Sequence, residues 1–80
     1  MPRLKPGAKV TIIDPYEARP TLVGRKFVVG VTSGTVIRKV RPSTVSGGRG
    51  YEVDVEWEGL GHTGAPVVKR HEERILTLLD

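Results

Sequence analysis

The stretch from Tyr51 to Glu58 alternates apolar and acidic residues without interruption, and this pattern limits the folds open to the chain. Its odd positions are Tyr, Val, Val and Trp, and its even positions are Glu, Asp, Glu and Glu. Successive side chains of a strand point to opposite faces, so the pattern predicts a half-buried strand. The β-branched run Gly34–Arg41 and the turn-forming stretch Pro42–Gly50 come before it. Residues 34–59 therefore predict a long β-hairpin with an exposed, mobile tip.

Two more strands are predicted on either side of this hairpin. Residues Lys9–Ile13 are rich in β-branched side chains, and we expect Val10 and Ile12 to point inward. The strand should stop at Asp14-Pro15, because proline cannot donate a hydrogen bond to a ladder. Residues Pro66–Arg70 predict the second strand, with proline at its first position.

The tail His71–Leu79 fits two structures. Ile75, Leu78 and Leu79 fit a helical stripe, whereas Leu76 and Leu78 fit the alternation of a strand. We expect one turn of 3-10 helix near His71–Arg74, followed by a short strand that closes a barrel.

The faces of the run Gly34–Arg41 conflict. In a regular strand each face would combine aliphatic and basic residues: Val36, Arg38 and Val40 on one side, Ile37, Lys39 and Arg41 on the other. A strong bend or a β-bulge would resolve the conflict, but the sequence does not fix the register.

Residues Asp14–Ser33 form a long connection between the first two strands. Pro15, Pro20, Gly24 and Gly30 interrupt it, so we expect no helix of useful length. Within it, Arg25–Val29 is apolar enough to cover the barrel as an irregular strand. Connections of this size are uncommon in compact domains and are usually functional.

The bulk composition predicts one small domain. The chain has 80 residues, no cysteine and mostly Val, Ile and Leu as apolar residues, which suits a tightly closed sheet. No apolar run is long enough for a signal peptide or a membrane span, so we expect a soluble, cytoplasmic protein. The predicted fold class is all-β: a single barrel of about five strands over residues 1–80.

Three segments carry a resemblance to a known fold: Lys5–Ile13, Ser33–Val40 and Tyr51–Glu56. Together with the long first loop and the turn before the last strand, they resemble the SH3-like barrel. Within that superfamily the pattern is most similar to the KOW-type barrels of transcription and ribosomal proteins. Those barrels pair a leading glycine-hydrophobic strand with a second glycine that opens the next strand.

Shorter segments resemble other barrels of the same class. Val55–Gly59 is similar to a strand of chromo-like barrels, which read methylated lysine tails, although glutamates replace the lysines. Asp14–Arg19 resembles the start of eukaryotic SH3 domains, without the tryptophan that floors their peptide groove. The overall pattern also resembles the barrel in the β subunit of nitrile hydratases, a structural cap on another chain's active site.

The basic residues are the first candidate site. The net charge is +4 and the pI about 9.9, which permits nucleic acid as a partner. Phosphate contact needs positive charge and hydrogen-bond donors, which seven residues could supply along one side and at the hairpin tip: Arg25, Lys26, Arg38, Arg41, Arg49, Lys69 and Arg70. The alternative is an ordinary surface on which these cations pair with Glu52–Glu58.

Aromatic residues of the long connection are the second candidate. Tyr16 and Phe27 could stack on a base or contact a partner, or could fix the connection to the core. Core packing is the favoured interpretation for Phe27, whereas the two are balanced for Tyr16. Tyr51 and Trp57 belong to the core by their alternation.

Catalytic and cofactor chemistry is not predicted. There is no cysteine nucleophile, no serine in a recognisable elbow and no phosphate-binding loop, since Gly24–Gly30 lacks its spacing. His62 and His71 do not have the spacing of a known metal-ligand set, so no metal is expected.

We therefore expect a non-catalytic binding module, with nucleic acid as the first choice of ligand. The alternative is a protein-interaction or structural adaptor module. Examples are a phage or mobile-element accessory protein that binds a host or virion protein, and a small subunit of a larger assembly.

Overall fold

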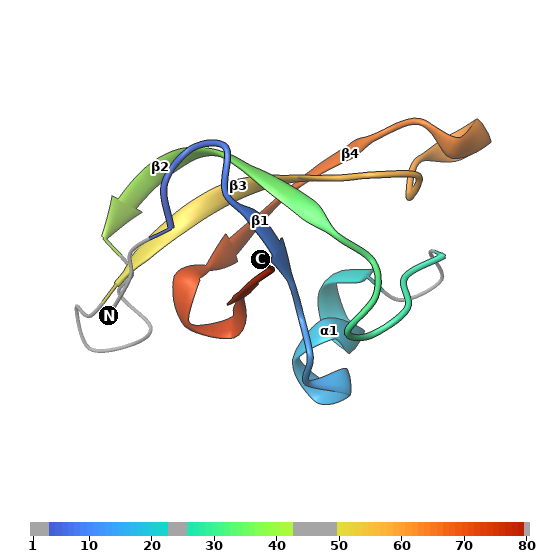
Figure 1. Ribbon diagram of the computed structural model, residues 1–80, viewed down its shortest axis with the longest axis horizontal. Helices are drawn as coiled ribbons and strands as arrows, with labels where there is room; N and C mark the ends of the chain where they lie inside the picture. The colour runs from blue at the N-terminus through green and yellow to red at the C-terminus, as the bar shows by residue number, and fades with distance from the viewer. Residues whose placement is uncertain (1–3, 23–25, 43–49, 80) are drawn as a thin grey trace.

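Five strands, one α-helix and two 3-10 turns make up the described chain (Figure 1). The computed structural model describes residues 4–22, 26–42 and 50–79. In chain order the elements are β1 (Lys9–Thr11), α1 (Pro15–Leu22), β2 (Gly34–Pro42), β3 (Tyr51–Trp57), η1 (His62–Gly64), β4 (Val67–Glu72), η2 (Glu73–Ile75) and β5 (Thr77–Leu78).

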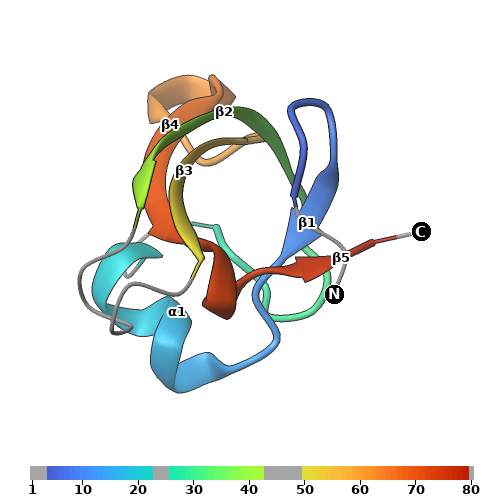
Figure 2. The same ribbon diagram turned by 90° about the vertical axis from the view of Figure 1, so that its left-hand side faces the viewer.

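The strands form one antiparallel sheet in the order β4-β3-β2-β1-β5. The predicted hairpin is confirmed, because β2 and β3 pair from Gly34 opposite Trp57 to Pro42 opposite Tyr51. The sheet curves strongly around its inner face (Figure 2). Within the described residues no ladder joins β4 to β5, so the sheet is open and not the closed barrel that the sequence led us to expect. The hairpin tip at residues 43–49 lies outside the described part of the chain.

Two register shifts resolve the conflicting faces of β2. They lie between Val36 and Arg38 and between Lys39 and Arg41. Each shift adds a residue on β2 and reverses the alternation, so that Val36 faces the core while Arg38 and Arg41 share a face with the acidic side chains of β3. The predicted bulge is confirmed.

The core lies on the inner face of the curved sheet. Val10 and Ile12 point inward as predicted, and the odd positions of β3 that follow Tyr51 are fully buried. Thr11 is also buried. Its hydroxyl donates a 2.7 Å hydrogen bond to the carbonyl of Thr32, which replaces the bond to water that burial removes. The apolar residues of the core are Leu4, Val10, Ile12, Ala18, Leu22, Val36, Val53, Val55, Trp57, Leu60 and Leu76.

Helix α1 contradicts the prediction that the connection holds no helix of useful length. Pro15 occupies the first helical position, where a missing N–H costs nothing. Asp14 caps this end: its Oδ1 accepts the Tyr16 amide at 2.9 Å. Pro20 lies near the other end of the helix, where its missing N–H removes one hydrogen bond from the ladder of a helix that is only eight residues long. Ala18 and Leu22 are the buried residues of the helix. Among the described residues no helix is both long and apolar enough to cross a membrane.

The rest of the connection is held by backbone bonds rather than by strand pairing. The predicted irregular strand is wrong for Lys26–Val29, which forms no ladder, and Arg25 lies outside the described residues. The amide of Gly30 donates to Ile12 O at 3.1 Å, and the amide of Val28 donates to the Thr32 hydroxyl at 2.8 Å. The segment thus turns back against the end of β1.

The tail has the predicted 3-10 turn and a short last strand. The turn spans Glu73–Ile75 rather than His71–Arg74, because β4 continues through Glu72, and the last strand does not close a barrel. In η2 the Glu73 carboxylate accepts two backbone amides from distant segments, Tyr51 at 3.0 Å and Leu4 at 3.2 Å. Strand β5 then pairs with β1, with Leu78 opposite Val10. Glu73 therefore ties the N-terminal segment and β3 to the tail.

We expect Gly34→Ala to lower the free energy of unfolding by about 1–3 kcal/mol. A Cβ at this position would lie 2.5 Å from Val55 Cγ1 and 2.8 Å from Trp57 Cε3, both of them core atoms. Urea unfolding followed by tryptophan fluorescence measures the change. Ser33→Ala is the control, and an equal, small effect of both substitutions would show that the core has room at Gly34.

Candidate functional site

The structure spreads the predicted basic residues over three elements. Arg38 and Arg41 lie on β2, Lys69 and Arg70 on β4, and Lys26 in the connection. Arg25 and Arg49 lie outside the described residues.

Two of these arginines meet at Asp54 on β3, which lies between β2 and β4. Asp54 stands opposite Arg38 on one side and Arg70 on the other, and its oxygens accept from Arg38 Nε at 2.7 Å and Arg70 Nε at 3.0 Å. Asp54 is only 3% exposed, although the alternation of the sequence puts it on the side of the strand away from the core. The hydrogen bonds from Arg70 and Arg38 lower the pKa of Asp54 below its usual value, so the buried carboxyl stays ionised.

A second row of charges crosses the sheet nearer the tip. Arg41 Nε donates to Glu52 at 2.8 Å, and Glu52 stands opposite Glu72. Two like charges in opposite positions destabilise a sheet. Arg74 offsets this, because its guanidinium lies 3.5 Å from Glu72 and 3.6 Å from Glu17 of α1.

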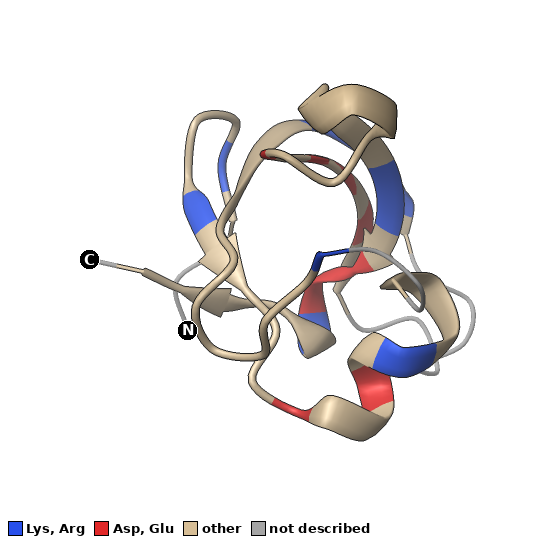
Figure 3. Cartoon of the chain, turned by 90° about the vertical axis from the view of Figure 1, so that its right-hand side faces the viewer, with Lys and Arg blue, Asp and Glu red and all other residues tan. Residues whose placement is uncertain are grey.

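These pairs leave the outer sheet face electrically balanced. We define this face by the charged strand residues that point away from the core: Lys9, Arg38, Arg41 and Arg70 against Glu52, Asp54, Glu56 and Glu72. Figure 3 shows acidic segments of one strand beside basic segments of the neighbouring strands. A surface with equal numbers of opposite charges creates little net positive potential for a phosphate backbone.

The two aromatic candidates differ in position. Phe27 is half-buried and packs edge-on against Trp57, with ring centroids 5.4 Å apart, as expected for core packing. Tyr16 is 80% exposed on the first turn of α1. Tyr16 is therefore the aromatic side chain available to a partner.

Tyr16 was a candidate contact in the sequence analysis, and the structure exposes four further apolar side chains in the same connection, which the sequence analysis did not name one by one. The group has five members, all in the connection between β1 and β2. Two of the most exposed are Val31, at 71%, and Ile13, at 61%. The sequence pointed to this segment through its length, because long connections in compact domains are usually functional. We call the group the apolar patch: Ile13, Tyr16, Val28, Val29 and Val31.

Backbone hydrogen bonds fix the loop that carries three of these residues. The bond from the Gly30 amide to Ile12 O holds this loop against the end of β1. The amides of Val31 and Thr32 both donate to Val28 O, at 3.0 and 2.9 Å. Tyr16 follows Ile13 through the capped start of α1.

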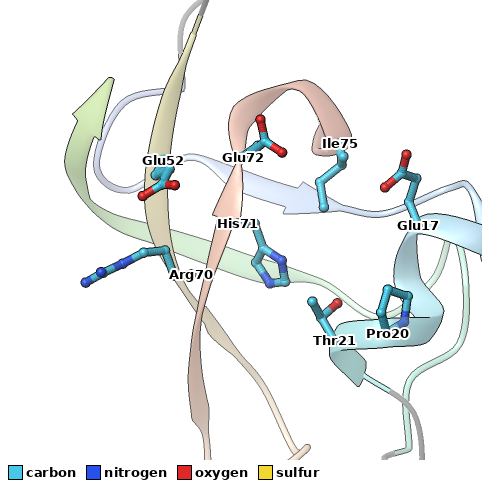
Figure 4. A pocket seen from close by; sticks show the side chains of 8 residues that line it. All are labelled: Glu17, Pro20, Thr21, Glu52, Arg70, His71, Glu72 and Ile75. Atoms are coloured by element: carbon cyan, nitrogen blue, oxygen red, sulfur yellow. The ribbon is translucent and has the colours of Figure 1, made fainter. Parts of the chain in front are cut away.

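A small pocket of about 210 Å³ lies between β4, η2 and α1 (Figure 4). The His71 ring points from β4 toward Thr21 and Pro20 of α1, and Ile75 lies across the opening. The pocket also touches the Glu17, Glu52 and Glu72 side chains, which are the acids bound by Arg74 and Arg41.

His71 is a buried partner of Trp57. It is 4% exposed, and its Nε2 accepts the Trp57 Nε1–H at 2.9 Å. Indole nitrogen can only donate, so the His71 proton resides on Nδ1 in the neutral ring. Burial, with a smaller contribution from the charge of Lys69, lowers the pKa of His71 to about 4.

The two histidines lie in different environments. His62 is exposed in η1, whereas His71 faces Trp57. Among the described residues, no three His, Asp or Glu side chains are grouped so as to hold a metal ion.

Comparison of the chain with protein-family models, curated proteins and solved structures gives no match.

We expect Asp54→Asn to lower the free energy of unfolding by about 1–2 kcal/mol at neutral pH. The neutral amide keeps an acceptor oxygen for one arginine but turns an NH2 donor toward the other. Glu56→Gln is the matched control: it lies on the same strand face, is exposed and has no ion pair among the described residues. Chemical unfolding of both variants makes the comparison. Equal effects would mean that the Asp54 bonds add nothing beyond an ordinary surface charge.

We expect stability to fall as the pH falls from about 6.5 to about 4, by at most about 3 kcal/mol from His71. The unfolded chain binds a proton at His71 near pH 6.5, whereas the folded chain resists it until about pH 4, so acid favours unfolding in this window. Unfolding measured across the window tests this. His71→Gln keeps an acceptor for Trp57 and should flatten the slope, and an unchanged slope would assign the acid effect to other groups.

Proposed function

We propose that this protein is a non-catalytic protein-interaction module that binds its partner through the apolar patch. The observation that carries the proposal is the exposure of five large apolar side chains in one connection. Contiguous exposed apolar surface rimmed by polar residues is typical of protein-binding sites. The other large exposed apolar residues are single positions on different strands: Ile37, Val68 and Leu78.

The paired arginines reduce the support for nucleic acid as the ligand. Arg38, Arg41 and Arg70 each donate to an acid of β3, so a phosphate would have to compete with an existing ion pair. Cations without an ion pair among the described residues are scattered over separate elements: Lys5, Arg19, Lys26, Lys39 and Lys69. Nucleic acid is therefore the alternative that the test below must distinguish.

For the fold we propose an SH3-like barrel that is partly open. Three features support this: the strand order, the bulged β2 and the 3-10 turn before β5. Such a barrel carries its ligand contacts on loops at the rim, which agrees with a binding site in the connection between β1 and β2.

The test selects binding peptides from a random displayed library and measures their affinity for defined variants. We expect Ile13→Ser with Val31→Ser to weaken the selected peptides at least about tenfold, because exposed apolar anchors supply most of the binding energy. Val68→Ser is the control, since it removes an exposed valine from β4 outside the patch.

Fluorescence anisotropy with duplex DNA, single-stranded DNA and structured RNA completes the test. If the proposal is right, the protein should show no salt-sensitive binding to any of the three nucleic acids. Salt-dependent binding that survives the patch substitutions would overturn the proposal in favour of nucleic acid.

A further inference from the structure

We propose that the pocket between β4, η2 and α1 binds a neutral carboxamide group, such as the side chain of a glutamine. The inference goes beyond the function proposed above and does not depend on the apolar patch, because none of the residues that line the pocket belongs to that patch. Two observations carry it: a buried ring nitrogen of His71 without a hydrogen-bond partner, and the pairing of the charges that line the pocket.

The Nδ1–H of His71 is a donor that lacks an acceptor. The ring uses Nε2 to accept the Trp57 N–H, so the proton of the neutral ring resides on Nδ1. The pKa of His71 is lowered to about 4 by burial, which keeps the ring neutral at neutral pH. Nδ1 is itself buried and has no hydrogen-bond partner among the described residues. Since nearly all buried polar groups in proteins are hydrogen-bonded, this nitrogen marks a place where an acceptor is expected.

The His71 ring forms part of the pocket wall. Figure 4 shows the ring pointing from β4 toward Thr21 and Pro20, which line the pocket on the α1 side. The Thr21 hydroxyl is directed to its own helix, because it donates to the carbonyl of Ala18 at 3.3 Å. Thr21 is exposed, and exposed side chains change rotamer within nanoseconds, so Thr21 can turn aside when a group enters toward Nδ1.

The charges that line the pocket favour a ligand without net charge. Every charged side chain of the lining already belongs to an ion pair, so a charged ligand would compete with an existing partner and would meet little net potential. The pairs are Glu17–Arg74, Glu52–Arg41, Arg70–Asp54 and Glu72–Arg74. The buried donor that remains, the Nδ1–H of His71, is neutral and needs only an acceptor.

A carboxamide fits both the donor and the lining. Its oxygen would accept the Nδ1–H of His71. Its NH2 group could donate to a lining carboxylate such as that of Glu17, which Arg74 approaches only to 3.6 Å, beyond hydrogen-bond distance. Pro20 and Ile75 offer apolar contact to the adjoining methylene groups. The volume of about 210 Å³ is sufficient, since a cavity of about 150 Å³ holds benzene, which is no smaller than a glutamine side chain.

The experiment titrates three small molecules of similar size into the full chain, labelled with ¹⁵N. Propionamide is the probe, and propionate and propylammonium are the charged controls. The chain has one tryptophan, so the NMR signal of its indole N–H, which donates to His71, reports on this site without ambiguity. The nitrogen shift of His71 Nδ1 is the second readout.

We expect propionamide to shift both signals until they saturate, with a dissociation constant in the millimolar range that is typical of such a small ligand. Propionate and propylammonium should leave both signals unchanged at the same concentrations. Thr21→Leu places a larger side chain in the pocket and leaves the Trp57–His71 bond intact, so it should weaken propionamide at least about tenfold. Thr77→Leu is the matched control, because it makes the same change at an exposed position of β5 that does not line the pocket.

Two further ligands distinguish the sources of the carboxamide. N-acetylglutamine methylamide presents it as a side chain, and the corresponding glutamate compound is its control. Tighter binding of the glutamine compound than of propionamide would assign the ligand to a polypeptide, and the reverse order would assign it to a free small molecule. Either order supports the proposal, whereas equal binding of the glutamate compound would contradict it.

Three results with propionamide would overturn the inference: no saturable shift of the two signals, equal shifts with the charged controls, or binding that Thr21→Leu leaves unchanged. Circular dichroism confirms that each variant is folded. The function proposed above is tested separately, because Ile13→Ser with Val31→Ser leaves the lining of the pocket intact and should bind propionamide like the wild type.

Discussion

The burial of Trp57 sets the conditions that the rest of this small protein has to meet. The ring is fully buried, and its N–H needs an acceptor that no apolar core supplies, so His71 of β4 lies beside it. The position opposite Trp57 on β2 is Gly34, where a larger side chain would overlap the indole ring. Phe27 packs against the indole ring edge-on. The Trp57 side chain on β3 thus contacts β2, β4 and the connection between β1 and β2.

Strand β3, which carries Trp57, organises charge as well as apolar surface. Its inner side chains fill the core, while its outer ones draw arginines from both neighbouring strands onto Asp54 and Glu52. A buried carboxylate is tolerated only where donors replace the water it has lost, and two guanidinium groups do this for Asp54. The consequence for function is direct: arginines used in this way stabilise the sheet and no longer form a positive surface.

Sequence periodicity was informative where a single face of a strand decides burial. It predicted the hairpin, the bulge in β2 and the turn before the last strand. It failed at α1, because two prolines suggested a loop although the first stands where helices accept proline. It also failed at Asp54, whose burial depends on arginines from two other strands, and at the apolar patch, because the exposure of Val31 depends on a turn fixed by hydrogen bonds between segments. Such long-range contacts leave no local pattern.

These constraints indicate why the connection between β1 and β2 is the part of the described chain best suited to bind a partner. On β2, β3 and β4 one face contributes to the core, and on the other face Arg38, Arg41 and Arg70 are held in ion pairs. The connection instead exposes apolar side chains on a backbone held by Gly30, Val31 and Thr32 amides. In the proposed function these exposed side chains, and not the paired arginines of the sheet, would supply the affinity for a partner.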